Sequence, residues 1–164
     1  MKKFLGVMLF TLISTATYGQ VLVSTFKLGK DEPFGCCPGR KMIKTKFKVT
    51  DEKDLKYVKF HYYIVNAVGD VVSGRDYGIT QEGREYIKPK TFAITGPMES
   101  GKTYVPWASG VIQTNQTVTA IPYQIEIVYM GSDESIFIDI NKENYIKYFP
   151  KLKWIEYNRW NKAL

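Results

Sequence analysis

The segment Gly96–Thr103 reads GPMESGKT and matches G-x-x-x-x-G-K-[ST], the pattern of a phosphate-binding P-loop. In such a loop backbone N–H groups cradle the phosphates, the lysine reaches the β- and γ-phosphates, and the hydroxyl binds Mg²⁺. The preceding residues, Thr91 to Thr95, have strand character, which the motif also requires. The match therefore raises the hypothesis of a nucleotide-binding enzyme.

The residues that follow the match do not have the pattern of a helix. A P-loop aims a helix N-terminus at the phosphates, but the next residues here are YVPWASG, with Pro106 only three positions after Thr103. No βαβ pattern surrounds the match, and no apolar strand ending in aspartate supplies a magnesium ligand. We therefore predict a connection between strands, extended or irregular from Thr103 to Gly110, in which glycines take positive φ and Pro97 sets the turn.

Other catalytic chemistry has few candidate residues. His61 is the only histidine and lies in a predicted strand, and no G-x-S-x-G elbow is present to supply a nucleophile. Zinc usually takes four ligands, so this histidine with Cys36 and Cys37 does not predict a metal site. We predict no catalytic residue, metal or cofactor. A hydrolase, or an NTPase that uses Lys102, is the less favoured alternative.

Cys36 and Cys37 are the only cysteines, and they are adjacent in FGCCPGR. A disulfide between neighbours distorts the geometry that the bond prefers. The open alternatives are a disulfide to another chain, a strained bond within the pair, and a reduced pair in an ordinary turn.

The N-terminus has the layout of a bacterial secretory signal peptide. A basic MKK precedes the apolar run FLGVMLFTLISTA, which is too short to span a bilayer, and small residues follow in TATYGQ. We predict a signal peptide over residues 1–19, with cleavage before Gln20; cleavage after Ala16 or an uncleaved anchor are the alternatives. The protein is then secreted or periplasmic, without a transmembrane segment, and the NQT sequon at 115–117 is expected to stay unglycosylated.

Length and charge are those of one small basic domain. Cleavage leaves about 145 of the 164 residues, enough for a hydrophobic core. Removal of Lys2 and Lys3 lowers the formal net charge from +7 to +5. Such a chain is attracted to anionic surfaces such as lipopolysaccharide or acidic glycans, but this attraction identifies no partner and no specific nucleic acid.

The rest of the chain reads as short runs of alternating apolar residues, separated by clusters of Gly, Pro, Asn and Asp. The strongest run is 55–67, with Val58 and Phe60 on one face and His61 on the other. The pattern predicts an all-β fold, an antiparallel two-sheet immunoglobulin-like sandwich, over residues 20–141. Residues 142–164 form an aromatic and basic extension packed on the domain, either a broken helix or an extra strand.

Three stretches carry a resemblance to known proteins: DEKDLKYVKFHYYIVNAVGDVVSG, ITGPMESGKT and IPYQIEIVYMGSDES. They resemble small exported bacterial domains of the FxLYD type and related immunoglobulin-like sandwiches, over Lys46 to Ile138. The order of Gly131 and Asp133 in MGSDE departs from that pattern. The resemblance implies a sandwich in which GPMESGKT connects two strands, and it implies no catalytic residues.

Aromatic and basic residues are the candidates for contacts with a partner. Tyr and Trp are enriched where binding energy concentrates, and we predict contact residues at Tyr77, Tyr86, Trp107, Trp154 and Trp160. A basic sheet face that could bind polyanions or glycans is predicted from Arg40, Lys41, Lys44, Lys46 and Lys48. The alternative is that these lysines are only the solvated side of a strand.

These features predict an exported, non-catalytic binding module of the cell envelope, with a protein or glycan as its partner. The alternative is a periplasmic inhibitor or immunity protein that binds one protein partner.

Overall fold

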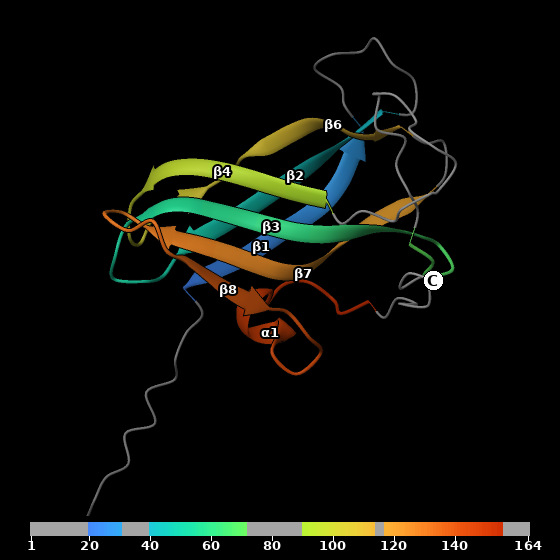
Figure 1. Ribbon diagram of the computed structural model, residues 1–164. Coiled ribbons are helices and arrows are strands. Elements are labelled where there is room, and N and C mark those ends of the chain that lie inside the picture. The colour runs from blue at the N-terminus through green and yellow to red at the C-terminus, as the bar shows by residue number, and fades with distance from the viewer. Residues whose placement is uncertain (1–19, 31–39, 72–89, 114–116, 156–164) are drawn as a thin grey trace, which may run out of the picture.

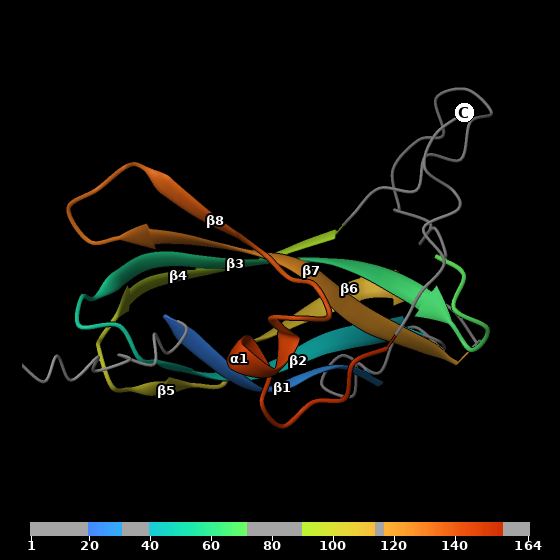
Figure 2. The same ribbon diagram turned by 90° about the horizontal axis from the view of Figure 1, so that it is seen from below.

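The computed structural model describes residues 20–30, 40–71, 90–113 and 117–155, which form two antiparallel sheets packed face to face (Figures 1 and 2). The first sheet contains β1 (Val21–Lys30), β2 (Arg40–Val49), β5 (Thr103–Tyr104) and β6 (Trp107–Gln113). The second has the order β4-β3-β7-β8, from β4 (Lys90–Met98), β3 (Leu55–Asn66), β7 (Val118–Tyr129) and β8 (Ser135–Asp139). The predicted all-β two-sheet sandwich is confirmed, and the sheets do not close into a barrel.

The core lies between the two sheets and follows from the alternation of each strand. In β3 the side chains of Val58 and Phe60 are fully buried, whereas His61 is on the outer face, as predicted. Phe60 contacts Phe26 of β1 and Phe47 of β2, with ring centroids 5.4 Å and 5.8 Å away. Burial of each such ring contributes about 1.5–3 kcal/mol, so aromatic contacts across the core hold the sheets together.

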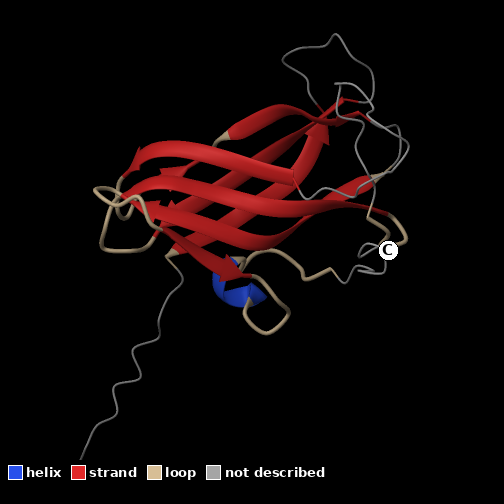
Figure 3. Cartoon of the chain, viewed as in Figure 1, coloured by secondary structure: helices blue, strands red, loops and turns tan. Residues whose placement is uncertain are grey.

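The segment after β8 contains one helical turn, α1 (Tyr145–Tyr148), the only helix in the described part of the chain (Figure 3). In the turn before it, the backbone N–H of Asn141 donates to Asn144 Oδ1 and the backbone N–H of Asn144 donates to Asn141 Oδ1, both at 3.0 Å. Tyr145, Tyr148 and Phe149 are buried in the core that the two sheets share. For the described part of the C-terminal extension, residues 142–155, the structure therefore shows a short helix rather than a strand.

The connection from β4 to β5 corrects part of the prediction for GPMESGKT. Pro97 lies inside β4, which continues to Met98, so it does not set the turn. Gly101 does take a positive φ, of 76°, but Gly96 is needed for another reason. A Cβ at Gly96 would lie 2.4 Å from the carbonyl oxygen of Leu55, where the β3–β4 register shifts. The predicted extended conformation after Thr103 is confirmed by β5 and β6.

Candidate functional site

The outer face of the first sheet carries a row of lysines. Lys44, Lys46 and Lys48 of β2 are exposed because they alternate with residues that face the core. Lys27 of β1 is also exposed and pairs with Lys44 in the β1–β2 ladder. On the other side of β2, Lys44 pairs with Trp107 of β6. We call this surface the lysine face; its members are Lys27, Lys44, Lys46, Lys48 and Trp107.

The charged residues in the strands of this sheet are all basic. Its four strands contain no aspartate or glutamate. Their basic residues are Lys27, Lys30, Arg40, Lys41, Lys44, Lys46 and Lys48. The lysines of the face make no ion pair with any described residue; the ion pairs that the structure shows lie elsewhere, at Lys56, Lys59, His61 and Lys102. Unneutralised charges of one sign on one surface produce a positive potential that attracts anions.

Trp107 places an aromatic surface beside these charges. Its side chain is 50% exposed, and the backbone next to it is fixed because the N–H of Thr45 donates to the carbonyl oxygen of Pro106 at 3.1 Å. Trp107 was predicted as a contact residue, and Lys44, Lys46 and Lys48 as part of a basic face. The structure places Trp107 on the same face as these lysines, directly beside Lys44. Lys41 is only partly exposed, and the side chain of Arg40 lies outside the described residues.

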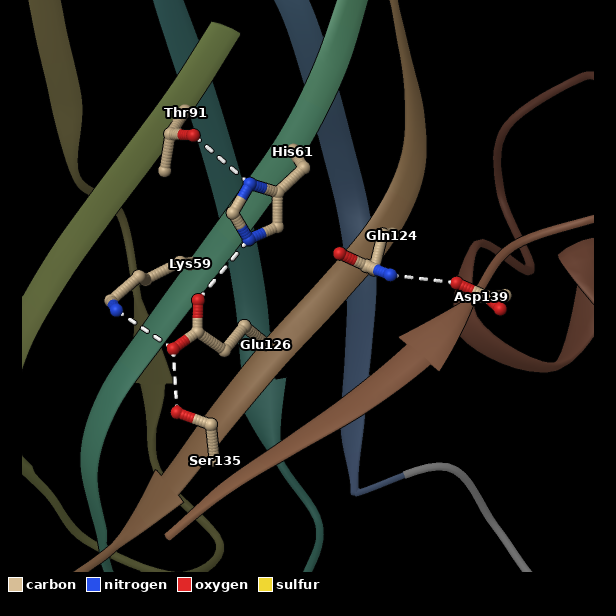
Figure 4. A network of polar contacts seen from close by, with 7 residues as sticks. All are labelled: Lys59, His61, Thr91, Gln124, Glu126, Ser135 and Asp139. Atoms are coloured by element: carbon tan, nitrogen blue, oxygen red, sulfur yellow. Dashed lines mark hydrogen bonds and ion pairs between the residues drawn. The ribbon is translucent and has the colours of Figure 1, made fainter. Parts of the chain in front are cut away.

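The outer face of the second sheet carries a polar network centred on Glu126 (Figure 4). The Glu126 side chain, only 8% exposed, accepts hydrogen bonds from Lys59 Nζ at 2.7 Å and Ser135 Oγ at 2.7 Å. His61 Nε2 lies 3.2 Å from the other carboxylate oxygen, and His61 Nδ1 lies 2.9 Å from Thr91 Oγ1. The network thus joins β4, β3, β7 and β8.

The electrostatics of Glu126 follow from these contacts. Burial raises the pKa of Glu126, but the hydrogen bonds from Lys59, Ser135 and His61 outweigh burial and leave the pKa below its ordinary value. The carboxylate is therefore ionised at neutral pH, and its charge is balanced mainly by Lys59.

Sequence reasoning found no partner for His61, and the structure supplies two. The order Thr91, His61, Glu126 is hydroxyl, imidazole, carboxylate, as in a nucleophilic triad. In this network, however, the Glu126 carboxylate is already neutralised by Lys59 and accepts a hydrogen bond from Ser135. The Thr91 hydroxyl lies on the outer face of β4, at the edge of the sheet. We interpret the network as a structural one, which fixes the register of four strands.

The P-loop match does not form an anion site. The backbone N–H groups of Glu99, Ser100, Gly101 and Lys102 all donate to acceptors within the protein. Lys102 Nζ pairs with Glu99 Oε2 at 2.6 Å, so the lysine is directed to its own loop. A phosphate-binding loop needs several backbone N–H groups that point to one place and have no other acceptor. In this segment the N–H groups already donate to acceptors in and around the β4–β5 turn.

The remaining predicted residues lie away from both faces or beyond the described chain. Trp154 is half-buried and packs edge-on against Tyr145, with centroids 5.1 Å apart. Tyr77, Tyr86, Trp160, Cys36 and Cys37 lie outside the described residues. Within the described ranges no group of His, Cys, Asp and Glu is placed to hold a metal ion, and no helix is long and apolar enough to cross a membrane.

Comparison with protein-family models, curated proteins and solved structures finds no match to this chain. The resemblance to FxLYD-type domains therefore stays a prediction, and the function is argued from the two sheet faces alone.

Proposed function

We propose that the protein is an exported, non-catalytic binding module that holds an anionic glycan of the cell envelope on its lysine face. The observation that carries this proposal is the segregation of charge: every charged residue in the strands of the first sheet is basic, and the exposed lysines have no acidic partner among the described residues. A merely solvated face explains why these residues are polar, but it does not explain why none of them is acidic.

The geometry of the face suits an extended polymer. Alternate residues of a strand lie about 7 Å apart, and neighbouring strands about 4.8 Å apart. Lys44, Lys46 and Lys48 thus form a line along β2, and Lys27 widens it onto β1. A charged polysaccharide presents its anionic groups in a comparable repeating row, and Trp107 offers a flat apolar surface to a sugar ring at the end of the row.

The proposal is tested with a defined probe, dextran sulfate, against uncharged dextran of the same length. We expect binding to dextran sulfate that weakens steeply as salt rises, because lysine contacts release counterions and are screened, and no binding to dextran. Equal binding to both polymers, or none to either, would contradict the proposal.

A further inference from the structure

In the part of the chain that the structure describes, β8 is an edge strand of the second sheet. Among the described residues it pairs with β7 alone, and Figure 1 places it at the outer margin of the sandwich. The other edges carry features that discourage pairing. β1 has Lys27 and a register shift after Val23, β4 contains Pro97, and the β2–β6 ladder is shifted after Lys41. β8 has no lysine, no proline and no register shift, although it is short, with five residues, and carries one charge, Asp139, at its end.

The backbone of β8 presents hydrogen-bonding groups to this open edge. The N–H of Ile140 donates to the carbonyl oxygen of Tyr123 in β7 at 2.8 Å. Because backbone groups alternate in direction along a strand, those of Ile138 face β7 and those of Phe137 and Asp139 face outward. The Asn144 side chain bonds the Asp139 carbonyl oxygen at 2.7 Å, which agrees with this direction.

Two apolar side chains of β8, those of Ile136 and Phe137, are exposed. Phe137 is 58% exposed and Ile136 41% exposed, although both lie in a regular strand. The strand reads Ser-Ile-Phe-Ile-Asp, so polar and apolar residues follow the same order from either end. A segment with this symmetry is complementary to itself in antiparallel pairing.

We propose that β8 pairs with β8 of a second copy of this chain, antiparallel, with the two-fold axis at Phe137. In this register Phe137 faces Phe137 of the copy. The backbone N–H of each Phe137 donates to the backbone carbonyl oxygen of the other. Ile136 faces Ile138, and Asp139 faces Ser135, so that the Asp139 N–H reaches the Ser135 carbonyl oxygen.

Charge favours this register over its neighbour. Centred on Phe137, no carboxylate of the strand faces another, because Asp139 faces Ser135. A shift that centres the pair on Ile136 would place Asp133 opposite Asp139, and like charges directly opposite are destabilising.

The pairing has a consequence for the lysine face. An antiparallel edge-to-edge pair has its two-fold axis perpendicular to the sheet, so the same face of each copy points in the same direction. Both lysine faces then lie on one side of the dimer, and a long anionic polymer could contact both. This consequence rests on the proposed function, whereas the pairing itself does not.

The test is sedimentation velocity of the purified protein, expressed from the full-length sequence, from about 1 µM to a few hundred µM, a range that brackets the weak affinity expected of a small interface. We expect a monomer–dimer equilibrium. Phe137→Lys should shift it at least about tenfold towards monomer, because two like charges meet at the axis. Met130→Lys, a matched change of an exposed apolar residue outside β8, should leave it unchanged.

Two further variants define the contact. Phe137→Pro removes an N–H that faces away from β7, so the fold should persist, as melting would show, while the dimer is lost. An equimolar mixture of Phe137→Lys and Phe137→Glu should recover the dimer that each lacks alone, because residue 137 faces itself. A wild type that stays monomeric throughout, a dimer that survives Phe137→Lys, or a mixture that fails to pair would overturn the proposal, whether or not dextran sulfate binds.

Discussion

Lys44 lies directly opposite Trp107 in the β2–β6 ladder, so an ammonium group and a half-exposed indole share one sheet face. If sugar rings pack on the indole, Trp107→Ala should weaken dextran sulfate binding about three- to tenfold. The slope of log affinity against log salt should stay the same, because no cation is lost. Fluorescence anisotropy with labelled polymer measures both quantities. An unchanged affinity would remove Trp107 from the site.

The Glu126 network predicts a pH-dependent stability. The pKa of Glu126 is lower in the folded protein than its ordinary value of 4.5, which applies to the unfolded chain. The ionised carboxylate therefore adds to the free energy of unfolding above pH 4.5, and this addition is lost as the pH falls through the folded pKa. Glu126→Gln should cost about 1–3 kcal/mol at neutral pH and reduce the loss of stability below about pH 4.5. Urea unfolding at several pH values measures this.

Glu134→Gln is the matched control for that experiment, because Glu134 is an exposed carboxylate close to β8. It should leave both the stability and its pH profile nearly unchanged. If Glu126→Gln and Glu134→Gln behave alike, the network does not stabilise the sheet.

Thr45 is a polar residue in the core, and its Oγ1 is buried without a hydrogen-bond partner among the described residues. Thr45→Val replaces the hydroxyl by a methyl group of similar shape and removes the cost of burying it. We expect a gain of about 1 kcal/mol in the free energy of unfolding, or about 2–4 °C in Tm. Thr45→Ser, which keeps the hydroxyl and loses the methyl, should lower Tm instead. A lower Tm for Thr45→Val would indicate that the hydroxyl is satisfied.

The two glycines of the P-loop match should respond differently to alanine. At Gly96 the new Cβ would clash with backbone atoms of β3, so Gly96→Ala should cost about 2–3 kcal/mol. At Gly101 the space is open, and only the positive φ is unfavourable, at about 1 kcal/mol. Thermal unfolding of both variants measures the difference. Equal costs would show that the close approach of β3 to Gly96 is not the constraint.

The sequence was sufficient for features that depend on local alternation. The inward and outward residues of β3, and the line of Lys44, Lys46 and Lys48, were predictable because apolar and polar residues alternate there. Pro106 was enough to argue against a P-loop helix. The partners of His61 were not predictable, because Thr91 and Glu126 lie beside it only through the registers of two ladders.

The pairing of strands that are distant in the sequence also explains the other features that the sequence did not predict. Lys27 and Trp107 join the lysine face by pairing with Lys44 on opposite sides, which no local pattern indicates. Pro97 was expected in the turn because proline favours turns, but β4 is an edge strand and tolerates it. The role of Gly96 depends on the carbonyl of Leu55, a residue far away in the sequence.

The central claim is that the lysine face binds anionic polymers, and charge reversal on that face tests it most directly. Lys46→Glu changes an exposed residue in the middle of the face, and Lys151→Glu makes the same change of charge on an exposed residue outside the four strands of the first sheet. At low salt we expect Lys46→Glu to weaken dextran sulfate binding by more than about tenfold and Lys151→Glu by less than about threefold. An equal loss for both variants would mean that binding follows net charge alone, and the lysine face would not be the site.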